Sequence, residues 1–185
     1  MRPFESNEDD LNALQQILGE ETVNTYLPWF PIKTRTETIA FYQEKIAKRT
    51  IFAVSRFFLA VCLKIDNRPI GYVSLSTNEN HDFGYGLRSE YWNQGIITEA
   101  AEEVLEQLKA QGLDYVTATH DRENIASGQV MKKLGMNYQY SCAENWQPKG
   151  KMVTFRMYQL NFKASVETYK KYWDESEEHF IETEL

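Results

Sequence analysis

The stretch from Phe83 to Thr119 constrains the fold more than any other part of the sequence. Phe83 to Arg88 is a short aromatic and apolar run typical of a strand. It leads through a glycine turn into Thr98 to Ala110, an amphipathic run typical of a helix. Leu113 to Thr119 predicts a second strand. A helix-length crossover between two strands requires them to run parallel, so this unit predicts a parallel strand pair with a ligand site at the carboxyl ends.

Three further helices are expected outside this unit. They run from Asn7 to Leu18, from Arg35 to about Lys48 and from Asn124 to Leu134. Capping-box spacing marks the first two starts, with Ser6 and Asp9 in one case and Thr34 and Glu37 in the other.

Four further strands complete the pattern. They are expected at Phe57 to Ile65, Ile70 to Thr77, Asn137 to Ala143 and Met152 to Leu160. The first two of these form a hairpin, because a turn-rich Asp-Asn-Arg-Pro segment joins them. Helices followed by an antiparallel meander and then by alternating strands and helices predict an α+β fold, with a mixed sheet covered by helices.

Composition narrows the class of protein. The chain has 20 Lys and Arg against 27 Asp and Glu, a net charge of -7, so the basic surface used by nucleic-acid-binding proteins is not expected. No apolar run approaches the ~20 residues of a membrane span, and the first residues lack the apolar core of a signal peptide. Cys62 and Cys142 are interpreted as reduced thiols, and no metal site is expected. A cytoplasmic protein without nucleic-acid or membrane partners is favoured.

The glycine turn itself has the chemistry of an anion site. A helix N-terminus leaves backbone N–H groups unpaired and carries a partial positive charge, so it can hold a phosphate without a basic side chain. Gly95 lets the backbone approach an anion, and the Thr98 hydroxyl adds a donor. A plain turn is the alternative. Downstream, Asn124 and Gly135 bracket the next helix, and each also has a structural reason to be there as a cap.

Taken together, the two segments resemble the GNAT superfamily of N-acetyltransferases, in the branch that includes ribosomal-protein N-terminal alanine acetyltransferases. The signature of a basic or Gln residue, two positions, Gly, one position and Gly or Ala aligns with Trp92 to Ile97. The second signature aligns with Asn124, Ser127 and the ending Lys133 to Met136. The resemblance covers about Arg2 to Leu160, which assigns residues 1–160 to the acetyltransferase domain and leaves 161–185 as an extension.

The resemblance implies a three-layer fold, helices on both faces of a central, mostly antiparallel twisted sheet, and one splayed parallel strand pair. Acetyl-CoA is the implied cosubstrate, with its pyrophosphate on the amides of the glycine turn and its pantetheine arm between the splayed strands. The implied cofactor contacts are Leu87, Arg88, Ser89, Asn93, Gln94, Gly95, Ile96, Ile97, Thr98, Asn124 and Ser127. Trp29, Phe30 and Tyr85 are assigned to the acceptor side, and packing of the two aromatics of the loop as a hydrophobic staple is the alternative.

Several positions depart from the family pattern. Trp92 replaces a basic or Gln residue, Ile97 replaces Gly or Ala, and the first strand is abbreviated at Arg2-Pro3-Phe4. Met131 stands where many members carry the tyrosine that protonates the departing thiolate, and a methionine donates no proton. Ser127 on the same helix is the substitute candidate, with helix capping as the alternative.

The attacking amine needs a base. Because an amine with a pKa near 10 is mostly protonated at neutral pH, a group or a relay water must take its proton. His81 and Asp82, at the head of the Phe83 strand, are the candidates. A surface histidine without a role is the alternative for His81.

Two functions follow. The first is transfer of acetyl from acetyl-CoA to a primary amine, on a protein N-terminus or a small molecule. The second is a non-catalytic CoA-binding or interaction module that keeps the fold. In residues 161–185, an expected helix carries Val166, Tyr169, Tyr172, Trp173 and Phe180 on one face. It packs on the domain or on a partner subunit, in which case the protein is a homodimer.

Overall fold

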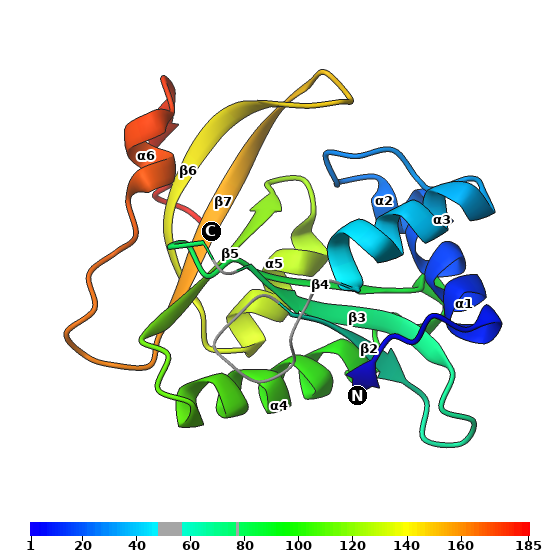
Figure 1. The fold of residues 1–185 in the computed structure, drawn as a ribbon. Helices are drawn as coiled ribbons and strands as arrows, with labels where there is room; N and C mark the ends of the chain where they lie inside the picture. The colour runs from blue at the N-terminus through cyan, green and yellow to red at the C-terminus, as the bar shows by residue number, and fades with distance from the viewer. Residues whose placement is uncertain (48–56, 77) are drawn as a thin grey trace.

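The computed structural model describes residues 1–47, 57–76 and 78–185, and Figure 1 shows its arrangement. Two four-stranded antiparallel sheets replace the single central sheet that was expected. The first has the order β1 (Arg2–Pro3), β2 (Phe57–Cys62), β3 (Pro69–Leu75) and β4 (Phe83–Leu87). The second has the order β5 (Tyr115–Asp121), β7 (Lys151–Asn161), β6 (Asn137–Trp146) and β8 (His179–Phe180).

The two sheets meet between β4 and β5, which are both edge strands. A parallel bridge joins Asp82 to Thr117 just before β4, and the Thr117 amide donates to the His81 carbonyl oxygen at 3.3 Å. In the part of the chain that the structure describes, no ladder continues the pairing beyond this bridge. The predicted parallel pairing of these two strands is therefore limited, in the described residues, to the single bridge between Asp82 and Thr117.

Two helices on one face of the first sheet, α1 (Glu8–Gly19) and α3 (Arg35–Phe41), begin at residues whose side chains cap them. α1 is capped by Asn7, which accepts from the Asp10 amide, so the expectation that Ser6 caps this helix is wrong. α3 begins with the predicted capping box of Thr34 and Glu37 and continues as the π-helical turn η1 (Tyr42–Ile46). The predicted end at Lys48 lies outside the described residues. A short helix, α2 (Glu21–Asn24), was not predicted.

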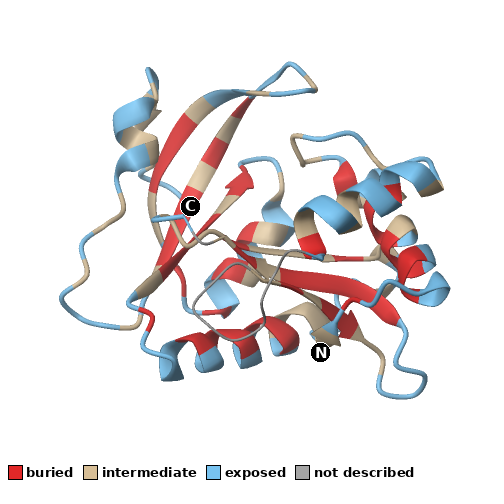
Figure 2. Cartoon of the chain, viewed as in Figure 1, coloured by how far each residue is buried: buried red, intermediate tan, exposed pale blue. Residues whose placement is uncertain are grey.

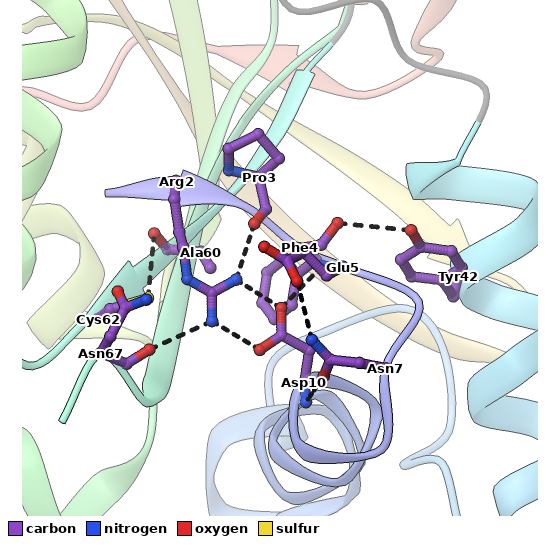
Figure 3. A network of polar contacts seen from close by, with 10 residues as sticks. All are labelled: Arg2, Pro3, Phe4, Glu5, Asn7, Asp10, Tyr42, Ala60, Cys62 and Asn67. Atoms are coloured by element: carbon purple, nitrogen blue, oxygen red, sulfur yellow. Dashed lines mark hydrogen bonds and ion pairs between the residues drawn. The ribbon is translucent and has the colours of Figure 1, made fainter.

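The short first strand is tied to α1 by a buried ion pair (Figure 3). The Arg2 guanidinium donates to both carboxylate oxygens of Asp10, at 2.5 and 2.6 Å, and the Glu5 amide donates to the same carboxylate at 2.7 Å. Asp10 is 2% exposed. A bidentate pair of this kind fixes geometry as well as charge, so the abbreviated strand keeps a defined position.

The other face carries α4 (Ile96–Ala110) and α5 (Ile125–Lys133). Side chains alternate along β3, so Tyr72 joins the buried cluster under α1 and η1 while Val73 joins the cluster under α4 and α5. Figure 2 shows buried positions concentrated along the strands and along the inner sides of the helices. The first sheet therefore has helices on both faces, as the three-layer expectation requires.

Residues 162–185 differ most from expectation. The predicted helix is reduced to α6 (Lys171–Glu175) and the short strand β8, which pairs with β6. Trp173 packs edge-on against Tyr140 at 5.5 Å between ring centroids, and Tyr172 against Phe155 at 5.8 Å. The segment packs on the second sheet of its own chain, beside β6 and β7 (Figure 1). No helix in the described ranges is long and apolar enough to cross a membrane.

Candidate active site

The glycine turn begins α4 earlier than predicted. Gly95 has a φ of 78° and is the N-cap of the helix, which starts at Ile96 instead of Thr98. A side chain at Gly95 would meet nothing within 4 Å. The Glu99 amide donates to the Gly95 carbonyl oxygen, so the amides of Ile96, Ile97 and Thr98 precede the first intrahelical bond. These three donors lie at the positive end of the helix without an intrahelical partner.

One side chain fastens this turn to β4, and a second fastens it to the segment that follows β4. The Trp92 indole donates to the Leu87 carbonyl oxygen at 2.7 Å, and the Gln94 amide group donates to the Glu90 carbonyl oxygen at 3.1 Å. Asn93 also has a left-handed backbone, with a φ of 59°. Trp92, which departs from the family pattern, therefore anchors the turn to the end of β4 through its indole.

The backbone of β4 has one side paired and one side facing β5. The Arg88 amide donates to the Ile70 carbonyl oxygen, and the Asp82 carbonyl oxygen accepts from the Ser76 amide. The backbone N–H and C=O groups of the even-numbered residues of β4 therefore point toward β3. Hydrogen bonding alternates along a strand, so the amides of Tyr85 and Leu87 point toward β5. Arg88 is a predicted cofactor contact, but its amide is already hydrogen-bonded within the sheet, to the Ile70 carbonyl oxygen. The Ser89 amide lies 3.3 Å from both carboxylate oxygens of Glu20, a contact that no sequence pattern indicated.

Across the junction, the start of α5 meets β4. The Asn124 side chain accepts from the Ser127 amide at 3.2 Å, which confirms Asn124 as the N-cap. Ser127 is thus inside the helix, and its hydroxyl lies 3.1 Å from the Tyr85 hydroxyl. Tyr85 also donates to the Ser127 carbonyl oxygen at 2.8 Å, and burial raises the pKa of Tyr85. The structure brings together a residue predicted at the acceptor side and the predicted proton donor.

Met131 does not reach this contact. It is 1% exposed and belongs to the core between α4, α5 and the sheets. The position that the resemblance aligned with a family tyrosine is therefore filled with close-packed apolar atoms in this chain.

His81 and Asp82 sit at the bridge, on a loop held by side chains. The Asp82 amide donates to the Ser76 hydroxyl at 3.0 Å, and that hydroxyl donates to the Asn80 side-chain oxygen at 2.7 Å. His81 has a φ of 44° and packs against Tyr115 at 5.1 Å, and desolvation lowers its pKa.

Asp82 is the more strongly perturbed of the two groups. Part of its surface is accessible, but protein atoms crowd its carboxyl and exclude most solvation, and this burial raises its pKa to about 6. Alternation places Asp82 on the face of β4 that carries Gly84 and Gly86, whereas Tyr85 is on the opposite face. The candidate base and the candidate acid therefore lie on opposite faces of one strand.

Trp29 and Phe30 are 40% and 60% exposed and belong to neither cluster under the helices. Both the acceptor-side assignment and the staple alternative stay predictions for these two residues. The turn between β6 and β7 reaches this part of the molecule, because the Lys149 ammonium donates to the Asn24 carbonyl oxygen of α2 at 2.7 Å.

A wide polar groove of about 1310 Å³ lies elsewhere, along α1 and beside the end of β4. Glu20, Arg88, Ser89 and Glu90 line its β4 side, but Asp82 and Gly95 do not. Size alone therefore does not identify the candidate site. Within the described residues, no cluster of His, Cys, Asp and Glu is suited to a metal ion.

The chain has the fold of acetyltransferases of known structure. A GNAT acetyltransferase from Bacillus anthracis superposes with a TM-score of 0.73 at 22% identity, over 87% of this chain and 93% of that one. The acetyltransferase MccE, solved with acetyl-CoA and AMP, superposes with a TM-score of 0.69 at 15% identity, over 82% and 86% of the two chains. At these identities the likeness concerns the fold.

Sequence comparison gives the family. The model of the acetyltransferase (GNAT) domain matches residues 1–137, and the chain belongs to this family, whose members use acetyl-CoA. YnaD of Bacillus subtilis strain 168, described as an uncharacterized N-acetyltransferase, is 40% identical over 57 residues. That match spans 30% of this chain and 34% of YnaD.

Proposed function

We propose that the protein transfers an acetyl group from acetyl-CoA to a primary amine by direct attack on the thioester. The observation that carries the proposal is the junction of β4 and β5, two edge strands that share one bridge and have the Gly95 turn at the end of β4. The acceptor is a protein N-terminus or a small-molecule amine.

The residues at the junction fit acetyl-CoA. The open space before Gly95 and the unpaired amides of Ile96, Ile97 and Thr98 suit a pyrophosphate. The amides of Tyr85 and Leu87 can pair with the pantetheine arm, as an added strand would. Asn124 and Ser127 approach from α5. When bound, acetyl-CoA supplies an acyl group on an activated thioester.

The chain's own groups supply the proton transfers. Asp82, with a pKa of about 6, is mostly carboxylate at pH 7 and takes the proton that the amine nitrogen releases as its bond to the acyl carbon forms. The Tyr85 or Leu87 amide stabilises the charge on the acyl oxygen. As the carbon–sulfur bond breaks, the Ser127 hydroxyl donates its proton to sulfur and regains one from solvent, while the Tyr85 hydroxyl holds Ser127 in place through its carbonyl and hydroxyl oxygens. Opposite faces of β4 then serve the arriving amine and the departing thiol.

A second candidate is a CoA-binding module without catalysis. Burial of Met131 at the position of the usual proton donor favours it. The two candidates differ in turnover and not in CoA binding.

The test combines acetyl-CoA with a panel of amines that includes alanine-terminated peptides, polyamines and amino sugars. Released thiol and acetylated product are both measured. Equal amounts of thiol and acetylated amine support the enzyme. Binding of acetyl-CoA without thiol release for any amine supports the module.

A further inference from the structure

We infer that the C-terminal segment 162–185 forms part of the acceptor side of the active site and that Tyr172 is a positioning residue for Asp82. This inference rests on the proposed function, because it assigns a role in amine acetylation to a segment outside the matched residues 1–137.

The first step is a chain of side-chain contacts that leads from the segment to Asp82. The Asn80 side-chain nitrogen donates to the Tyr172 hydroxyl at 2.5 Å. The oxygen of the same amide accepts from the Ser76 hydroxyl at 2.7 Å, and Ser76 in turn accepts from the Asp82 amide at 3.0 Å. Tyr172 therefore terminates a network that fixes the backbone of Asp82.

The same loop is tied to β5. The buried Thr117 hydroxyl donates to the Asn80 carbonyl oxygen at 2.7 Å, and the Thr117 amide donates to His81. Asn80 thus connects three parts of the protein that are distant in the sequence. The parallel bridge between β4 and β5 lies directly beside it.

Tyr172 is itself held firmly. Its ring packs edge-on against Phe155 of β7 at 5.8 Å and against Tyr169 at 5.3 Å. Its carbonyl oxygen accepts from the Cys142 thiol at 3.5 Å. Farther along, the Glu182 carboxylate pairs with Arg156 and accepts from the Ser141 hydroxyl. The segment is therefore an anchored platform for the Tyr172 hydroxyl.

Tyr172 and Asp82 occupy the same face of the molecule. Thr117 and Phe155 lie on the side of the second sheet opposite Val116 and Ala118, which pack in the core with α4 and α5. Asp82 lies on the corresponding side of β4. Burial raises the pKa of Tyr172, and the negative charge of the nearby Asp82 raises it further. This is the face left to an amine if the acetyl-CoA arm approaches from α4 and α5.

The network holds Asp82 without using its carboxylate. Its contacts with Ser76 and Asn80 pass through its backbone amide. Among the residues that the structure describes, the Asp82 carboxylate has neither an ion-pair partner nor a side-chain hydrogen bond. Neither oxygen is therefore committed to another side chain of the described residues, and Tyr172 sets the position of the backbone that carries them.

Tyr172→Phe in the full chain tests this role, with Tyr169→Phe as the matched control. Tyr169 lies in the same aromatic cluster, and its hydroxyl has no hydrogen-bond partner in the described part of the chain. At saturating acetyl-CoA, Tyr172→Phe should lower kcat/KM for the amine at least tenfold. Its Kd for acetyl-CoA should stay within twofold, and Tyr169→Phe should change both values by less than twofold.

Asn80→Ala provides a second variant. It should reproduce the loss, and the double variant with Tyr172→Phe should be no worse than either single variant, because both remove one network. An amine kcat/KM within twofold of wild type in Tyr172→Phe overturns the inference, as does a parallel loss of acetyl-CoA affinity. If the wild-type protein acetylates no amine, the proposed function fails instead.

Discussion

The Tyr85 hydroxyl donates to the Ser127 carbonyl oxygen at 2.8 Å and lies 3.1 Å from the Ser127 hydroxyl, which links the edge of β4 to the first turn of α5. No local pattern predicts this contact, because the residues are 42 positions apart. It holds the Ser127 hydroxyl at the junction without involving Met131.

Removal of either hydroxyl should slow turnover. Ser127→Ala is expected to lower kcat by 10²- to 10⁴-fold, the usual range for general acid help, with the acetyl-CoA Kd within a few-fold. Tyr85→Phe should lower kcat in the same direction. Tyr42→Phe, which removes a hydroxyl that donates to the Phe4 carbonyl oxygen far from the junction, is the control. A loss below threefold in Ser127→Ala would reassign Ser127 to structure.

Gly95→Val should abolish tight acetyl-CoA binding. A branched side chain at Gly95 projects into the open space in which the pyrophosphate is expected, so the Kd should rise more than tenfold by calorimetry. Gly112→Val is a close control at the other end of α4, where φ is 87° and the space is also open. Both variants should lose about 1–3 kcal/mol of stability from backbone strain. Similar Kd values for the two variants would contradict the anion site.

Asp82 should couple stability to pH. Burial raises its pKa from 3.8 to about 6, so the folded state holds this proton more tightly than the unfolded state does. The stabilisation is complete below pH 4 and is lost as the pH rises through 6. Asp82→Asn should therefore be more stable than wild type at pH 8, by on the order of 2 kcal/mol, with little difference at pH 4. Urea unfolding at both pH values measures this, and equal differences at the two values would contradict it.

The same carboxylate should set the pH dependence of the rate. With Asp82 as the base, kcat/KM for the amine rises between about pH 5 and 7, and this rise disappears in Asp82→Asn. His81→Asn is the control, because asparagine tolerates the positive φ at this position. A rise that is lost in His81→Asn and kept in Asp82→Asn would assign the base to His81.

Met131→Tyr should not restore a proton donor. The side chain is buried in a close-packed core, so the added volume is expected to destabilise the protein by about 1–3 kcal/mol. Turnover should not exceed that of wild type at a temperature where both are folded. A higher kcat would show that the phenol reaches the thiol.

Local signals predicted the elements well. The capping box at Thr34, the N-cap at Asn124 and the glycine turn at Gly95 all depend on neighbours within a few residues, and the structure has all three. Capping-box spacing predicts a cap at Ser6, whereas the neighbouring Asn7 caps α1, because spacing alone does not distinguish adjacent residues that can both cap a helix.

Contacts between distant segments could not be predicted in this way. The aromatic residues of 161–185 have helical spacing, but Tyr169, Tyr172 and Trp173 follow the surface of β6 and β7, which sets their conformation. The Glu20 contact with Ser89 and the Tyr172 contact with Asn80 likewise depend on the assembled fold. Both lie beside the residues that the family pattern assigned.

The most direct test of the central claim is a single assay of wild-type protein and Gly95→Val with acetyl-CoA and the amine panel, in which free thiol and acetylated amine are quantified together. The account predicts equal yields of thiol and acetylated amine for at least one amine with wild type, and a loss of both with Gly95→Val. Thiol release without an acetylated amine, or no release with any amine, would contradict it.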